Sequence, residues 1–245
     1  MSYFSDIVRS MPPVTKNLII VNFIIWLAMM VSPSLCARIM DFCALHFYEA
    51  DSFNLVQPFT YMFLHSTQSL AHIFFNMFTL FMFGITLERV MDSKRFLLYY
   101  VVCGVGAALI QEAVWALTLK STIVDGLAQL NGLSADTVRE WIARDPSILS
   151  SNYNFFQTVG ASGAIYGILL AFAMLFPNRP LYFMFIPVPI KAKWMMLIWG
   201  GAELLLGLGS ATDGVAHFAH LGGMIFGLAL ILYWRRSGTL HGDMY

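Results

Sequence analysis

Apolar runs of membrane-spanning length recur along this chain, separated by shorter polar stretches. A helix needs roughly 20 apolar residues to cross a hydrocarbon core about 30 Å thick. The pattern predicts six such helices, of which the first and fifth are the shortest; they cover residues 18–35, 69–87, 96–119, 158–176, 192–209 and 215–234. Residues 181–190 are apolar too, but the prolines in and beside this stretch favour a loop or an interfacial segment before the fifth helix.

One polar interval, residues 120–157, is longer than the others and separates the third helix from the fourth. Inside it, residues 135–143 follow Ser134, a good N-cap residue, and carry Val138, Trp141 and Ile142 at helical spacing. This pattern predicts a short amphipathic helix that lies on the membrane surface.

The positions of lysine and arginine set the expected direction of the chain through the membrane. With both termini in the cytoplasm, ten basic residues lie inside and four outside, and three of those four belong to the interval 120–157. Cytoplasmic loops of membrane proteins carry the excess of Lys and Arg. We therefore expect a cytoplasmic segment at residues 1–17, a six-span membrane domain at residues 18–234 and a cytoplasmic tail at residues 235–245.

Composition supports a membrane protein and excludes some functions. The chain is 58% hydrophobic and 11% charged, whereas soluble domains carry about 25% charged residues. Its formal net charge is zero, so nothing in the sequence indicates a nucleic-acid partner. Cys36, Cys43 and Cys103 show neither a CxxC motif nor the spacing of zinc ligands. We expect an all-α polytopic helix bundle without a cofactor or a bound metal.

Polar residues occur at one depth in three of the six predicted helices. The second, fourth and sixth helices all run from outside to inside, and each has its unusual polar residues near its outer end: His72 and Asn76, then Ser162, then His217 and His220. At 1.5 Å per residue, these groups lie about 5–10 Å below the outer helix ends. Ionisable groups inside a membrane span are costly and mark functional sites. We therefore expect the three helices to build one site.

The residue types at this depth suit peptide hydrolysis. Ser162 supplies a hydroxyl nucleophile, and a histidine of the sixth helix supplies a base that titrates near neutral pH. His72 and Asn76 are four residues apart, so both can donate hydrogen bonds to an oxyanion, together with the backbone N–H of Ser162.

No acidic residue is expected beside the base. Asp213 lies two helical turns above His220, and Glu112 and Glu203 read as isolated structural carboxylates. The sequence therefore favours a Ser–His dyad over a triad. His217, one turn before His220, reads as a structural or rim residue.

Glycines indicate how the fourth and sixth helices come together. Gly163 and Gly167 form one G-x-x-x-G pair, and Gly223 and Gly227 form another. Such pairs let helix backbones touch. Tyr166, one turn below Ser162, shares its helix face and is placed to stack on the imidazole of the base.

Three motifs resemble those of the rhomboid family of intramembrane serine proteases. They are GASGAIYG at residues 160–167, HIFFN at residues 72–76 and AHLGGMIFG at residues 219–227; the run LERVMDSKRFLLYY after the second helix also fits. The resemblance extends from about residue 59 to residue 234 and corresponds to the basic six-span form found in bacteria.

The resemblance implies roles for particular residues. Ser162 would be the nucleophile, and His220 would be the base because it is the histidine followed by Leu-Gly-Gly. His72 and Asn76 would form the oxyanion hole, and Tyr166 would support His220. The resemblance further implies that the substrates are single-span membrane proteins, cut near the outer boundary of the lipid bilayer. The expected location is a bacterial cytoplasmic membrane.

The sequence departs from the family pattern in two places, and two other functions remain as alternatives. Residues 55–59 read LVQPF where many bacterial members have a Trp-Arg pair, and the interval 120–157 is unusually long. One alternative function is that of a catalytically silent rhomboid-like protein that binds membrane spans. The other is metal transport, with His72, His217 and His220 as ligands.

Overall fold

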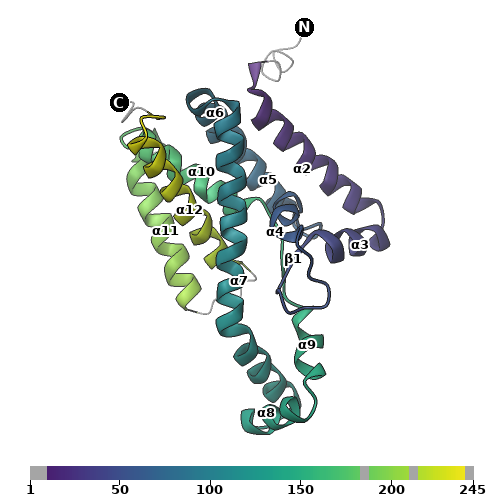
Figure 1. Cartoon of the computed structure of the whole chain (residues 1–245). Helices are drawn as coiled ribbons and strands as arrows, with labels where there is room; N and C mark the ends of the chain where they lie inside the picture. Colours follow the sequence, from purple (N-terminus) through teal and green to yellow (C-terminus); the bar gives the residue numbers. More distant parts are fainter. Residues whose placement is uncertain (1–9, 183–187, 210–214, 241–245) are drawn as a thin grey trace.

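The computed structural model describes residues 10–182, 188–209 and 215–240, which form a bundle of helices around α7 (Figure 1). The N-terminal half of the described chain contains α2 (Pro13–Val31), α3 (Pro33–Cys43), β1 (Leu45–His46), α4 (Gln57–Thr60), the 3-10 turn η1 (Tyr61–Phe63), α5 (Leu70–Thr79), the π-helical turn η2 (Leu80–Gly84), α6 (Ile85–Met91) and α7 (Ser93–Asn131). The second half contains α8 (Ala135–Arg144), α9 (Ser147–Tyr153), β2 (Gln157–Thr158), α10 (Ser162–Leu175), β3 (Pro180–Leu181), β4 (Ile190–Lys191), α11 (Ala192–Leu208) and α12 (His217–Arg236).

Among the described residues, four helices are long and apolar enough to cross a membrane: α2, the continuous α5–η2–α6 segment, α7 and α12. α10 is apolar but shorter, and α11 has 17 residues. The protein is therefore an all-α integral membrane bundle, and the count of six spans stays a prediction. α2 begins and α12 ends at the same end of the molecule (Figure 1), as the expected topology requires.

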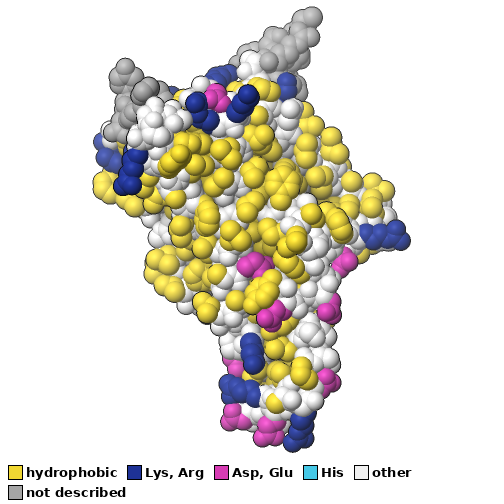
Figure 2. Space-filling view, in the orientation of Figure 1, with side chains coloured by type: hydrophobic (Ala, Val, Ile, Leu, Met, Phe, Trp, Pro, Cys, Tyr) yellow, Lys and Arg dark blue, Asp and Glu magenta, His cyan; other side chains and the backbone are white. Residues whose placement is uncertain are grey.

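The outer surface is apolar across the middle of the molecule. Figure 2 shows a broad band of hydrophobic side chains on this face. Lys and Arg lie at the end where α2 begins and α12 ends, and others lie among Asp and Glu on the part that projects at the opposite end. Large side chains such as Ile24, Leu205 and Tyr233 are more than half exposed. Such an apolar band is the surface that lipid tails cover.

The interval after the third predicted span is largely helical, which corrects the expected end at residue 119. α7 continues to Asn131, and α8 and α9 turn back along it as a projecting hairpin (Figure 1). Val124 and Ala128 of this extension pack with Val138 and Ile142 of α8 in a small separate core. Burial between the two helices explains why the polar stretch holds its helical form.

The predicted amphipathic helix is confirmed as α8, with its N-cap at Ser134, whose hydroxyl accepts the backbone N–H of Thr137. Its apolar face, however, lies against α7, with Val138 and Ile142 buried. These two side chains are covered by protein, whereas Trp141, the third apolar residue of the predicted face, is 40% exposed. The position of this helix on the membrane surface stays a prediction.

A buried glutamine stabilises the connection between α3 and α4 at the position where the family pattern differs. Gln57 is fully buried; its side-chain oxygen accepts the backbone N–H of His46 at 3.1 Å. Its amide nitrogen donates to the carbonyls of Asp41 (3.2 Å) and Ser52 (2.7 Å). Three backbone groups of the loop are thereby satisfied by one side chain.

The apolar stretch 181–190, predicted to be a loop or an interfacial segment, has a short strand at each of its described ends. β3 and β4 pair antiparallel, with Leu181 opposite Ile190, so the chain reverses direction here. Pro180 and Pro189 lie in or beside this pair, and Pro187 lies outside the described residues.

A buried carboxylate joins three helices at the end of the bundle opposite the projecting hairpin. Glu88 of α6 is 2% exposed and accepts the backbone N–H groups of Val14 (2.9 Å) and Thr15 (2.7 Å) in the first turn of α2. It also accepts the hydroxyls of Thr15 (2.8 Å) and of Ser93, the first residue of α7 (2.6 Å). The carboxylate thus satisfies N–H groups that a helix start leaves unpaired.

Replacing Glu88 by glutamine is expected to lower the free energy of unfolding by about 2–4 kcal/mol. In either orientation the amide turns its NH2 group toward one backbone N–H, that of Val14 or that of Thr15, which then loses its acceptor. The measurement is reversible unfolding in mixed detergent micelles. Glu140→Gln on α8 is the matched control, since the Glu140 side chain is 69% exposed. Equal stability of the two variants would show that the Glu88 contacts add nothing.

Candidate active site

Ser162 is the first residue of α10, which begins four residues later than the sequence predicted. Residues 157–158 instead form β2, which pairs with β1, and Gly160 has a φ of +131°. This backbone conformation is open to glycine and strained for other residues. The turn places Ser162 at a helix N-terminus, where unpaired backbone N–H groups and the helix dipole favour negative charge.

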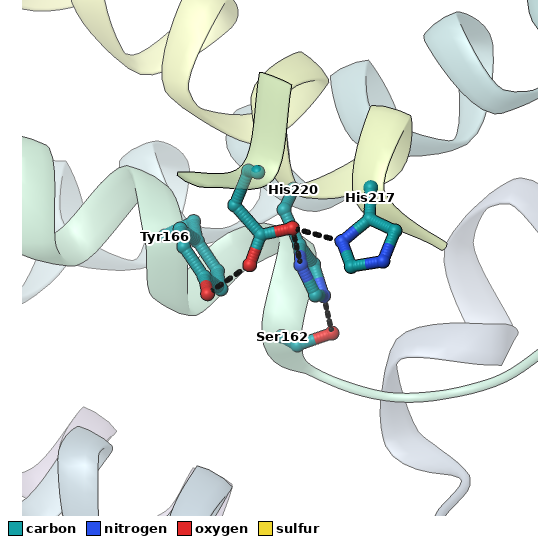
Figure 3. A network of polar contacts seen from close by, with 5 residues as sticks. Ser162, Tyr166, His217 and His220 are labelled. Atoms are coloured by element: carbon teal, nitrogen blue, oxygen red, sulfur yellow. Dashed lines mark hydrogen bonds and ion pairs between the residues drawn. The ribbon is translucent and has the colours of Figure 1, made fainter. Parts of the chain in front are cut away.

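The hydroxyl of Ser162 and the ring of His220 form a hydrogen bond between α10 and α12. His220 Nε2 lies 2.8 Å from Ser162 Oγ. The ring of Tyr166 stacks on the imidazole, with centroids 4.3 Å apart and planes 12° from parallel. The predicted stacking is confirmed, and Figure 3 shows Ser162 and His220 pointing toward one another.

Glycines bring α10 and α12 into backbone contact, as the two G-x-x-x-G pairs predicted. A Cβ added to Gly223 would lie 1.8 Å from the carbonyl oxygen of Gly163. A Cβ on Gly167 would lie 2.4 Å from the Sγ of Cys103 on α7, and one on Gly227 would lie 2.4 Å from the hydroxyl of Tyr99. The three helices are therefore packed as closely as their backbones allow.

The expectation that no acidic residue lies beside the base is wrong. Glu203 of α11 is 7% exposed, and its Oε2 lies 2.9 Å from Nδ1 of His220. The same oxygen lies 2.6 Å from Nδ1 of His217, and Oε1 accepts a short hydrogen bond from the hydroxyl of Tyr166 (Figure 3). Glu203 is thus not isolated, and two contacts link Ser162, His220 and Glu203 in a row. Asp213 lies outside the described residues.

His217 therefore belongs to this network through the carboxylate. Its ring is 6% exposed and stands nearly perpendicular to that of His220, with centroids 6.4 Å apart. Its Nδ1 contacts Glu203 and not Ser162. This position agrees with the structural role expected of His217.

His72 of α5 lies near the serine, across Gly160. The backbone N–H of Ser66 donates to His72 Nδ1 (3.3 Å), so in the neutral ring the proton is on Nε2. A Cβ added to Gly160 would lie 2.8 Å from this Nε2 and 3.7 Å from Ser162 Oγ. An N–H donor and the serine hydroxyl therefore border the same small space, which the absence of a side chain at Gly160 keeps open.

Asn76 is buried one turn below His72 on the same helix, and its side-chain amide donates to the His72 carbonyl at 2.7 Å. This bond uses one of two amide hydrogens. His65, which the sequence left without a role, is fully buried with its ring centroid 5.1 Å from that of His72. Burial, followed by the effect of His72, lowers the pKa of His65 to about 3, so His65 is a neutral packing partner of His72.

Glu203, His217 and His220 are also the group of described residues whose donor atoms lie close enough to hold a metal ion. The carboxylate oxygen lies only 2.6 and 2.9 Å from the two ring nitrogens. Tetrahedral zinc, with bonds of about 2.0–2.1 Å, holds its ligand atoms about 3.3 Å apart. The observed spacing fits hydrogen bonds between these groups better than shared coordination of zinc.

Comparison with known proteins agrees with this arrangement. A family model described as the Rhomboid domain matches residues 52–237, which is most of the chain. The chain belongs to the rhomboid family. No curated protein matches the sequence closely enough to narrow this further.

Membership in the rhomboid family confirms the resemblance carried by the three motifs and the helical membrane fold. The region matched begins between α3 and α4 and ends just after α12, so it contains all the site residues. The sequence reasoning missed Glu203 as a site residue. A signal was present, because a carboxylate inside an apolar helix is a functional candidate by default.

Proposed function

We propose that this rhomboid protein is an intramembrane serine endopeptidase with Ser162 as nucleophile and His220 as general base. The observation that carries the proposal is the 2.8 Å contact between Ser162 Oγ and His220 Nε2 at the start of α10. A serine hydroxyl is a weak nucleophile until a base takes its proton, and this distance is within hydrogen-bond reach.

The surrounding groups match the steps of peptide hydrolysis. Ser162 Oγ attacks the scissile carbonyl while its proton passes to His220 Nε2. The oxyanion that forms lies in the space beside Gly160, where His72 Nε2–H can donate to it. The backbone N–H of Ser162 and the second amide hydrogen of Asn76 are the further donors that the family pattern implies. His220 then protonates the leaving amine, and the acyl-enzyme is hydrolysed by a water molecule that His220 deprotonates.

The substrates that suit this site are single-span membrane proteins embedded in the same lipid bilayer. A substrate helix has its backbone groups paired internally, so it must unwind locally before its carbonyl reaches Ser162. We propose entry from the lipid near α11, and a bacterial cytoplasmic membrane with both termini in the cytoplasm as the setting. Support for the direction comes from the excess of Lys and Arg on the inner side.

The competing function within the family is that of a silent protein that binds membrane spans. Against it stands the pairing of hydroxyl and imidazole, because a binding role needs neither. The metal alternative uses the same histidines, but the short distances to Glu203 favour hydrogen bonds over zinc coordination.

Covalent labelling of the purified protein with a fluorophosphonate tests the proposal. We expect one adduct, on Ser162, because the probe reacts with an activated serine. His220→Ala is expected to lose the labelling, and a chelator is expected to leave it unchanged. Absence of an adduct on Ser162 in folded protein would refute the protease function, and chelator-sensitive activity would favour the metal alternative.

A further inference from the structure

The carboxylate of Glu203 is buried at the depth of the serine and is held in place from two sides. Its Oε1 accepts the hydroxyl of Tyr166, and its Oε2 accepts the ring N–H of His217 at 2.6 Å. A buried charge is tolerated when hydrogen bonds satisfy it, and it is strongly unfavourable without them. The chain therefore supplies two side chains that fix the position of one carboxylate.

That position is at the far side of the base from the nucleophile. His220 Nε2 lies 2.8 Å from Ser162 Oγ, and Nδ1 of the same ring lies 2.9 Å from Glu203 Oε2. A neutral imidazole has one N–H and one lone pair. When Nδ1 carries the proton and faces the carboxylate, Nε2 offers its lone pair to the serine hydroxyl, which is the tautomer that a general base needs.

Nδ1 of His220 has no hydrogen bond that meets both the distance and the angle requirement, although Glu203 Oε2 is 2.9 Å away. The contact between these two atoms is therefore close but misaligned. Catalytic hydrogen bonds are often misaligned in free enzymes and tighten when substrate binds. The ring is free to adjust by a small rotation within its stack on Tyr166, whose plane is only 12° away.

We propose that Glu203 is a positioning residue that completes a Ser162–His220–Glu203 triad. The proposal rests on the function above and goes beyond the dyad that the sequence favours. Glu203 holds the Nδ1–H tautomer of His220 and stays ionised while His220 receives the serine proton, so that it stabilises the imidazolium formed during attack. Tyr166 has two tasks: its ring supports His220, and its hydroxyl holds the carboxylate.

Glu203→Gln is the sharpest variant, because it keeps the shape and removes the charge. The amide can present an N–H to Nδ1, which moves the ring proton to Nε2 and removes the lone pair that faces Ser162. We expect kcat to fall about 100-fold or more with KM changed less than threefold, and Glu203→Asp to recover part of the loss. Glu112→Gln on α7, another carboxylate within a long apolar helix, is the matched control and is expected to keep its kcat.

Nitrogen-15 NMR of histidine-labelled protein in detergent micelles gives a readout that a purely structural role would not move. We expect His220 to carry its proton on Nδ1 in the wild type and in Glu112→Gln, and on Nε2 in Glu203→Gln. A wild-type ring protonated on Nε2, or a kcat of Glu203→Gln within threefold of the wild type, would overturn the triad.

Failure of the triad can be told apart from failure of the protease function. Fluorophosphonate labelling of Ser162 in the wild type tests the nucleophile without reference to Glu203. If the wild type is labelled and cleaves substrate, but substitutions at Glu203 change neither kcat nor the tautomer of His220, the protein is a protease that uses a dyad. Unlabelled protein would refute the function, while the NMR experiment would still report on the contact between His220 and Glu203.

Discussion

Replacing Ser162 by alanine is expected to lower cleavage of a membrane-embedded substrate by about 10⁴-fold or more. In the proposed mechanism the hydroxyl attacks the carbonyl, and removing one member of a nucleophile–base unit costs about as much as removing the whole unit. The fold should survive, because Ser162 is at the start of α10 and its side chain is partly accessible. The measurement is initial cleavage rate of a single-span substrate in reconstituted vesicles, with folding checked by circular dichroism.

Ser151→Ala on α9 is the matched control, since this serine is exposed and hydrogen-bonds only within its own turn, to the carbonyl of Ile148. We expect it to cleave at the wild-type rate. Cleavage that persists in Ser162→Ala, in protein free of other proteases, would rule out Ser162 as the nucleophile.

Alanine at Gly223 is expected to reduce cleavage about 100-fold and to lower the unfolding temperature. The added methyl carbon would lie 1.8 Å from the carbonyl oxygen of Gly163, and this neighbour is backbone, so α10 and α12 must move apart by an ångström or more. The same separation lengthens the 2.8 Å contact between Ser162 and His220. A misplacement of about 1 Å in a catalytic constellation costs about 100-fold in rate.

Gly201→Ala on α11 is the control for this change, because a Cβ there meets no atom within 4 Å. Alanine favours helix over glycine by about 0.5–1 kcal/mol, so this variant should be at least as stable as the wild type. Thermal unfolding and cleavage are measured on both variants. Wild-type cleavage by Gly223→Ala would mean that the helix contact does not position the site.

The sequence predicted the site better than it predicted the ends of the helices. Ser162, His72 and His220 each lie a few residues from the start of an apolar run. Because a helix rises by a constant amount per residue, counting residues along each run is enough to predict that they lie at one level. The start of α10 was misplaced because the backbone leaves the helical conformation at Gly160, which the hydrophobic pattern does not record. The extension of α7 was missed because its stability comes from packing on α8.

Glu203 shows why contacts between distant segments resist prediction from a single sequence. Its partners His217, His220 and Tyr166 lie on α12 and α10, and nothing in the order of the chain tells which face of α11 meets them. Gln57 is similar: an unremarkable amide in a loop proves to satisfy three backbone groups that only the folded loop brings together.

Because Glu203 is on α11, its contact with His220 of α12 depends on the position of α11. Ser162 and His220 come from α10 and α12, whose backbones are in direct contact, whereas the carboxylate comes from a third helix. A shift of α11 by roughly 1–2 Å is enough to lengthen a hydrogen bond beyond its useful range. If Glu203 completes the triad as proposed, a substrate that displaces α11 on its way in would meet a serine and a histidine already paired, and would be cut at the full rate only after the helix returns.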